Sequence, residues 1–131
     1  MILLDTHIFV WWIHRNEKLP VTYQNYIEEN ISDGLGVSII SFWEISKLVE
    51  KNRLILPRNM NEWMENSLKY DGIILLELNI EIITTGHDLV QNFHKDPADQ
   101  LIAATSIVNN IPLLTLDKKI LHSESIITIK F

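Results

Sequence analysis

The chain has 131 residues, of which 47% are hydrophobic and 21% are charged, proportions that are ordinary for one globular domain. It contains no cysteine, which excludes a disulfide framework, a cysteine-ligated zinc site and a thiol nucleophile, and which fits the reducing cytoplasm. Its net charge of −6 disfavours a general nucleic-acid coating protein but leaves a nuclease open, because carboxylates that bind divalent cations also count as negative. We expect residues 1–131 to form a single domain in the cytoplasm.

The N-terminal run MILLDTHIFVWWIH is apolar, but it does not have the features of a signal peptide. It lacks a basic leader and a small-residue cleavage site, and it carries Asp5. No run approaches the roughly 20 apolar residues that span a bilayer, so we expect no membrane partner. Residues 1–4 instead predict a buried strand, and residues 7–14 predict a helix.

Strand-like and helical patterns alternate along the rest of the chain. Short apolar runs predict strands, and apolar residues at helical spacing predict helices. The predicted elements are helices at 20–31, 41–54 and 59–70, strands near 35–39 and at 72–78, helices near 79–86 and at 97–109, a strand at 111–116, a helical turn at 117–121 and a last short strand at 126–130. This alternation predicts an α/β fold with three layers, α/β/α, around a short, mostly parallel central sheet.

Four acidic residues lie where the predicted strands end or where a neighbouring helix begins. Asp5 directly follows the first strand, and Asp117 directly follows the run IPLLTL. Glu44 is predicted in the first turn of the helix after LGVSII, and Asp99 in the first turn of the helix at 97–109. In an open α/β sheet, sites lie beyond the carboxyl ends of the strands. We therefore expect these four carboxylates to meet at one edge of the sheet.

Helix capping is the competing interpretation of each acid taken singly. The sequence SFWE has the spacing of a capping box, in which Glu44 would bond the backbone amide of Ser41. In DPAD, Asp96 would cap the helix, Pro97 would take its first position, and Asp99 would lie near the positive end of its dipole. The other two acids could cap the helices that follow them. Capping does not explain why so many carboxylates should share one sheet edge.

Carboxylates that lie close together raise one another's pKa and destabilise the fold unless they share a proton or a cation. A divalent cation removes this repulsion, and a ligand set made only of oxygen favours Mg²⁺ or Mn²⁺. Such a site suits the hydrolysis of phosphodiester bonds, because a cation lowers the pKa of water and stabilises charge on phosphate oxygens.

Four stretches in this order and at this spacing resemble a known family. They are LLDTHIFVWW, SFWEISKLVEKNRL, HKDPADQLIAATS and PLLTLDKKI, and they extend over nearly the whole chain. The chain resembles the PIN-domain ribonucleases, and in particular the VapC-like toxins of prokaryotic toxin–antitoxin pairs. The resemblance implies a Mg²⁺- or Mn²⁺-dependent endoribonuclease that acts on RNA, forms a homodimer and is inhibited by a cognate antitoxin protein.

The resemblance also assigns site residues. It places the family's metal-binding acidic quartet at Asp5, Glu44, Asp99 and Asp117. Asp96 is similar to an additional catalytic acid in the subgroup with an H-x-D-P-x-D signature, and Thr6 and Thr115 match hydroxyl positions that orient the acids or a water molecule. His94 is a supporting candidate that would polarise a phosphate or bond Asp96, although a loop histidine is more often a surface residue. Gln100 departs from the pattern, since that subgroup often has arginine there.

Several other functions are disfavoured by missing motifs. No G-x-G-x-x-G or P-loop pattern occurs among the four glycines, which argues against nucleotide binding. An aspartyl-phosphate enzyme of the haloacid-dehalogenase type would need a second aspartate where His7 stands. The receiver domain of a response regulator would need an acidic pair near the N-terminus, and that pair is missing. The alternatives left open are a PIN-like module that binds RNA or protein without cleavage, and a PIN nuclease of RNA processing.

Two further groups of residues have both a structural and a functional interpretation. The stripe Met60, Trp63 and Met64 either packs in the core or forms a groove for an antitoxin helix. The densest basic group either contacts RNA phosphates or forms a solvated helix face, and it consists of Lys47, Lys51, Arg53 and Arg58. The histidines outside position 94 show no metal-ligand spacing and are interpreted as structural.

Overall fold

The computed structural model describes residues 1–89 and 95–131. Their centre is a four-stranded sheet in the order β3-β2-β1-β4, and every pairing between its strands is parallel. The strands are β1 (Ile2–Leu4), β2 (Leu35–Ser38), β3 (Ile73–Leu76) and β4 (Leu113–Leu114). The predicted short, parallel sheet is therefore confirmed.

The last predicted strand, at 126–130, is wrong. Thr128 makes only an isolated parallel bridge to Leu113 at the edge of the sheet. The Leu113 N–H donates to the carbonyl of Ile127, and the Leu113 carbonyl accepts from the N–H of Ile129. Because β4 has only two residues, it offers the C-terminal segment too short an edge for a ladder.

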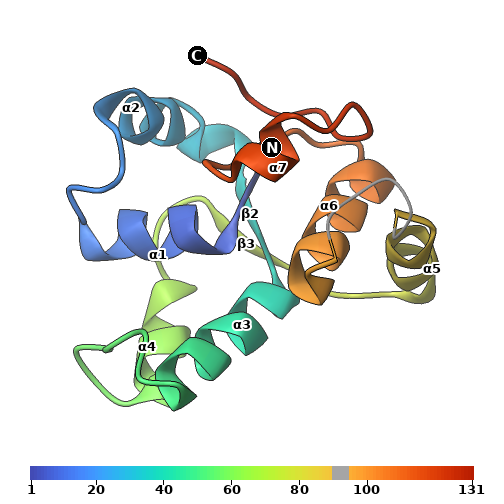
Figure 1. Cartoon of the computed structure of the whole chain (residues 1–131). Coiled ribbons are helices and arrows are strands. Elements are labelled where there is room, and N and C mark those ends of the chain that lie inside the picture. The colour runs from blue at the N-terminus through green and yellow to red at the C-terminus, as the bar shows by residue number, and fades with distance from the viewer. Residues whose placement is uncertain (90–94) are drawn as a thin grey trace.

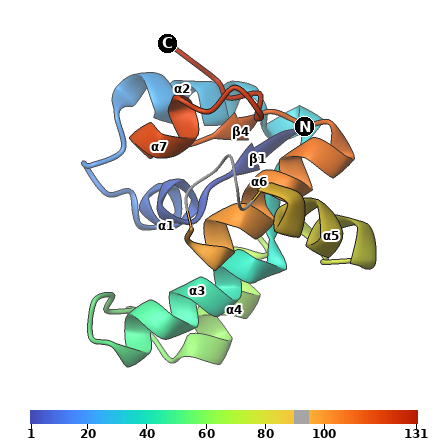
Figure 2. The same cartoon turned by 45° about the vertical axis from the view of Figure 1, so that its right-hand side comes forward.

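Helices cover both faces of the sheet, so the fold has three layers (Figures 1 and 2). The helices are α1 (Thr6–His14), α2 (Val21–Glu29), α3 (Ile39–Glu50), α4 (Met60–Ser67), α5 (Ile80–Asp88), α6 (Pro97–Asn109) and α7 (Lys118–Leu121), with a 3₁₀ turn at Ile31–Asp33. Within the described ranges, no helix combines the length and the apolar character needed to cross a membrane.

The alternation of side chains along β1 divides the core in two. Ile2 and Leu4 pack with α1, α2 and Trp63 of α4 on one face, and Leu3 packs with α5, α6 and α7 on the other. Trp63 is only 3% exposed, and its indole N–H donates to Nε2 of His14 at 2.9 Å. For Trp63, the core interpretation of the predicted stripe is therefore correct.

Helix α3 begins two residues earlier than the sequence pattern suggested. Its N-cap is Ser38, whose hydroxyl accepts the N–H of Ile40 at 3.2 Å. Ser41 is thus inside the helix, where its hydroxyl accepts a hydrogen bond from the Thr6 hydroxyl at 2.8 Å. The capping box predicted for Ser41 and Glu44 is wrong, because Ser38 already fills the cap at the end of β2. Glu44 lies in the second turn, so its carboxylate is not used in capping.

Candidate active site

Asp5 is the most buried acid of the candidate site. It joins the carboxyl end of β1 to α1 and is 2% exposed. Its Oδ1 accepts the N–H of Thr6 at 2.9 Å, and its Oδ2 accepts the hydroxyl of Thr115 at 2.6 Å. Thr115 comes from the neighbouring end of β4, and its hydroxyl oxygen also accepts the N–H of Asp117 at 3.0 Å. One buried hydroxyl therefore links the two acids that follow β1 and β4.

Asp117 and Asp96 each cap a helix. The Oδ1 of Asp117 accepts the N–H groups of Lys119 at 2.8 Å and Ile120 at 3.4 Å, at the start of α7. The Oδ1 of Asp96 accepts the N–H of Asp99 at 3.2 Å, at the start of α6. The capping interpretation of both residues is confirmed, and it leaves the second carboxylate oxygen of each outside these cap bonds.

Glu44 and Asp99 project from α3 and α6, which pack against each other. The Oε1 atom of Glu44 is buried and has no hydrogen-bond partner among the described residues. Carboxylate oxygens of Glu44, Asp96 and Asp99 all lie within 4.8 Å of one another. The packing of α3 against the start of α6 thus brings Glu44, Asp96 and Asp99 close enough together to bind one ion.

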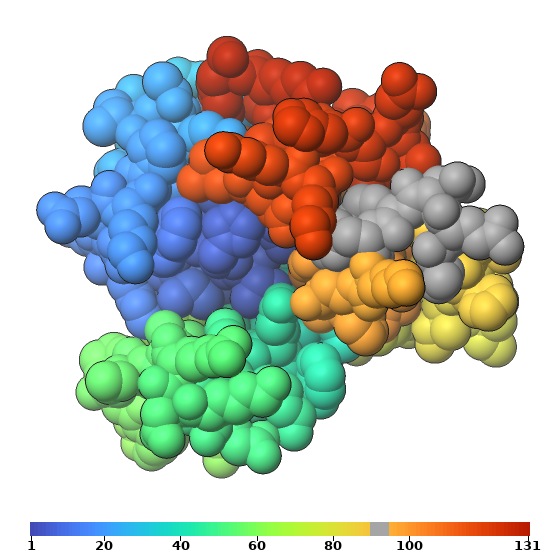
Figure 3. Space-filling model, in the orientation of Figure 1, coloured from blue at the N-terminus to red at the C-terminus, as the bar shows by residue number. Residues whose placement is uncertain are grey.

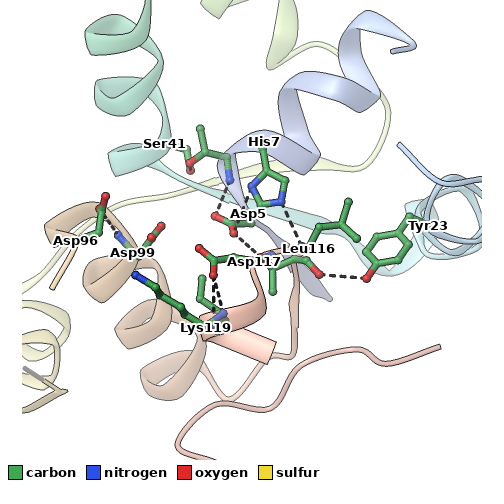
Figure 4. A network of polar contacts seen from close by, with 12 residues as sticks. Asp5, His7, Tyr23, Ser41, Asp96, Asp99, Leu116, Asp117 and Lys119 are labelled. Atoms are coloured by element: carbon green, nitrogen blue, oxygen red, sulfur yellow. Dashed lines mark hydrogen bonds and ion pairs between the residues drawn. The ribbon is translucent and has the colours of Figure 1, made fainter. Parts of the chain in front are cut away.

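The elements that carry the acids, α1, α3, α6 and α7, come together on one face of the molecule (Figure 3). Figure 4 shows Asp5, Asp96, Asp99 and Asp117 close together at this place. A cavity of about 280 Å³ opens there. The acids that line it are Asp5, Glu44, Asp99 and Asp117, and Thr6, His7 and Arg53 complete its polar lining. Asp96 lines a neighbouring cavity that also contains Glu44. The predicted meeting of four carboxylates at one sheet edge agrees with this arrangement.

Burial and repulsion within the cluster change how its members hold protons. Burial, followed by the charges of Asp5, Asp96, Glu44 and Asp117 in that order, raises the pKa of Asp99 to about 8. Burial also raises the pKa of Glu44; the Thr6 hydroxyl opposes that rise, and the charges of Asp5 and Asp96 add to it. Without a cation, the cluster therefore retains a proton at neutral pH.

The donor set fits a hard divalent cation. It consists of carboxylate oxygens from four chain segments, with no sulfur, and it includes Oε1 of Glu44, for which the described part of the chain offers no hydrogen-bond partner. Mg²⁺ and Mn²⁺ prefer such ligands. A cation would also offset the repulsion that adds to the effect of burial in raising the pKa values of Asp99 and Glu44.

His7 is a member of the site that sequence reasoning did not single out. Its Nε2 accepts the N–H of Leu116 at 3.2 Å, so in the neutral ring the proton lies on Nδ1, which is 3.6 Å from Oδ2 of Asp5. The ring also packs edge-on against Trp11, with centroids 5.2 Å apart. The spacing Asp-x-His after a strand is the only signal for this in the sequence. His94, the supporting histidine predicted from the sequence, lies outside the described residues.

Comparison with known proteins identifies the family. A model of the PIN domain matches residues 2–123. The chain belongs to the PIN-domain family. This PIN domain is 29% identical, over 119 residues, to Ribonuclease VapC22 of Mycobacterium tuberculosis, and the match covers 91% of this chain and 88% of the relative.

Solved structures of other proteins share the fold. VapBC2 from Rickettsia felis, bound to a DNA fragment from its promoter, matches with a TM-score of 0.73, 21% identity and 98% coverage of both chains. A toxin–antitoxin complex from Klebsiella pneumoniae matches with a TM-score of 0.68, 15% identity and coverage of 98% of this chain and 97% of the other. The three-layer α/β fold and the PIN-domain resemblance are thus confirmed.

Proposed function

We propose that this PIN domain is a divalent-metal-dependent endoribonuclease that hydrolyses phosphodiester bonds of RNA and acts as the toxin of a toxin–antitoxin pair in the cytoplasm. The main support for the proposal is the cavity that is lined by carboxylates from four chain segments, Asp5, Glu44, Asp99 and Asp117. A fifth acid, Asp96, caps α6 and lies close to two of them. Membership of the PIN family and similarity to Ribonuclease VapC22 support the choice of RNA as substrate.

The residues that would hold the cation, Mg²⁺ or Mn²⁺, are Asp5, Glu44, Asp99 and Asp117. A bound divalent cation supplies Lewis-acid chemistry, because it lowers the pKa of water and neutralises charge that develops on phosphate oxygens. Asp96 caps α6, and its carboxylate lies within 4.8 Å of those of Glu44 and Asp99, so it adds negative charge within reach of the same cation.

The chain's own residues prepare the cluster for this role. The Thr115 hydroxyl and the N–H of Thr6 donate to Asp5, which fixes the rotamer of its carboxylate. Asp99 is partly buried and is surrounded by acids, and both effects raise its pKa, so it holds a proton at neutral pH when no cation is bound. His7 packs against the same acid, with Nδ1 3.6 Å from the oxygen of Asp5 that Thr115 bonds. These residues orient the acids, and the open cavity beside them leaves room for a phosphate.

The partners follow from the same proposal. We expect inhibition by an antitoxin protein, since a toxin–antitoxin complex contains a chain of the same fold. We also expect a homodimer, as the resemblance to the VapC-like toxins implies. A cavity of about 650 Å³ between α1, α4 and the loop that joins α3 to α4 offers apolar walls for such a partner, including Ile55 and Tyr70. Arg58 and Asn66 also line it and supply polar contacts.

Replacing Asp5 with asparagine should abolish both RNA cleavage and growth arrest on expression of the chain alone. The Asp5→Asn change would place an amide beside the donating Thr115 hydroxyl, and it would remove one charge from the cation site. The matched control is Asp33→Asn, which alters an exposed acid outside the cluster and should leave the protein active and toxic.

Co-expression of the neighbouring reading frame, which we expect to encode the antitoxin, should relieve the arrest caused by the unaltered chain. An Asp5→Asn protein that still cleaves RNA would refute the proposed metal site. An unaltered chain that neither cleaves RNA nor arrests growth would refute the proposed function and favour a binding module.

A further inference from the structure

A second cavity of about 300 Å³ adjoins the acidic cavity along the outer side of α3. The two cavities share Glu44, Leu48 and Arg53. The second one differs from the first in its balance of charge, because three cations and two acids line it, whereas four acids and one arginine line the first. Its remaining lining residues are Trp43, Lys47 and Lys51 from α3 and its end, and Asp96, Pro97 and Ala98 from the start of α6.

Trp43 is the unusual member of this cavity. It is 51% exposed, whereas Phe42 and Ile45 of the same helix are buried in the core. The Nζ atom of Lys47 lies 5.8 Å from the centre of the indole ring, and it also forms an ion pair of 3.0 Å with Glu50. Packing of the fold therefore does not account for this large ring, which is available to a ligand.

The end of α3 determines where Arg53 lies. Asn52 takes a left-handed conformation, with φ of 57°. The N–H of Arg53 then donates to the carbonyl of Leu48 at 2.8 Å, and that of Asn52 donates to the carbonyl of Val49 at 3.1 Å, as in a Schellman motif. This turn brings the chain back along the helix, and Arg53 lines both cavities. A cation thus stands at the junction between the acidic cluster and the Trp43 cavity.

We propose that this cavity binds the single-stranded segment of RNA next to the bond that is cleaved, with a base stacked on Trp43 and backbone phosphates at Lys51 and Arg53. The inference rests on the proposed function, because it assigns the path of that substrate. An unpaired base offers a face to an aromatic ring, and lysine and arginine neutralise phosphates. In a chain of net charge −6, this concentration of cations beside the acidic cluster complements a polyanion that must reach it.

The test measures binding of a fluorescein-labelled 12-nucleotide oligouridine by anisotropy in EDTA, over a series of salt concentrations. Trp43→Ala should weaken binding at least about fivefold without changing the salt dependence, and Trp43→Phe should retain most of the affinity because it keeps a ring. Arg53→Ala and Lys51→Ala should each lower the slope of log affinity against log salt by about 0.7. Lys69→Ala, which alters an exposed lysine that lines neither cavity, is the charge control and should leave the slope close to that of the unaltered chain.

Two results would overturn the inference. The first is a Trp43→Ala protein that binds the oligonucleotide as tightly as the unaltered chain does. The second is a Trp43→Ala protein whose molecular mass by light scattering differs from that of the unaltered chain, which would assign Trp43 to a protein interface. These failures are distinct from failure of the proposed function. If Trp43-dependent binding is found but the unaltered chain cleaves no RNA with Mg²⁺ or Mn²⁺, then the nuclease proposal fails and the binding surface stands.

Discussion

Replacing Asp99 with asparagine is expected to abolish RNA cleavage and, at the same time, to make the metal-free protein more stable at pH 8. Asp99 has its pKa raised to about 8 by burial and by four neighbouring acids. Asparagine has the same shape and cannot ionise, so it removes both the cost of burying a charge at this position and the repulsion by the neighbouring acids. The gain in the free energy of unfolding should be about 1–3 kcal/mol, because solvent and salt screen a side chain that is only partly buried. Thermal unfolding in EDTA measures it.

The stability gained by Asp99→Asn should depend on pH, and the two pKa values of Asp99 give the direction of that dependence. The pKa of Asp99 is 3.8 in the unfolded reference state and about 8 in the folded protein. The folded protein therefore binds the proton more tightly, so the stability it gains from protonated Asp99 is present below pH 3.8 and is lost as the pH rises toward 8. The advantage of Asp99→Asn should be absent near about pH 4 and largest near about pH 8. Asp33→Asn is the control and should show no such trend. An advantage that does not vary with pH would contradict the electrostatic account of the cluster.

Replacing Thr115 with valine should destabilise the protein by about 2–4 kcal/mol and sharply reduce cleavage. Valine has nearly the same shape, but it cannot donate to Oδ2 of Asp5 or accept the N–H of Asp117. Since Thr115 is fully buried, no water replaces these bonds without rearrangement. Urea unfolding and an RNA-cleavage assay measure the two effects.

Two further variants test whether the lost hydroxyl of Thr115 is the cause of the reduced stability and cleavage. Thr115→Ser keeps the hydroxyl and should retain most of the activity. Thr84→Val alters an exposed threonine of α5 whose hydroxyl bonds its own helix, at the carbonyl of Glu81, and should change stability little. If Thr115→Val and Thr84→Val prove equally mild, the hydroxyl does not organise the two acids.

The positions of the acids that follow strands were predictable from the sequence. Asp5 and Asp117 come directly after apolar runs, and parallel strands bring their carboxyl ends to one edge. Asp99 was predictable as well, because Pro97 marks the start of a helix. These three acids were expected to lie close together because, in a parallel sheet, strand ends and helix starts of this kind share one edge.

The remaining features depend on tertiary geometry that short motifs do not contain. Glu44 looked like part of a capping box, and its freedom from that role depends on Ser38, which ends β2 and caps α3. The place of Arg53 depends on a left-handed Asn52 at the end of α3. The bond of His7 to the chain after β4 joins segments 109 residues apart. Local propensity does not specify such contacts.

The most direct test of the account is RNA cleavage by protein from which metal has been stripped with EDTA. The carboxylate cluster is proposed to work only with a divalent cation, so the stripped protein should leave a labelled RNA intact. Addition of Mg²⁺ or Mn²⁺ in excess of the chelator should restore cleavage, and it should not do so for Asp99→Asn. Full cleavage in EDTA would contradict the central claim that these acids act as a metal site.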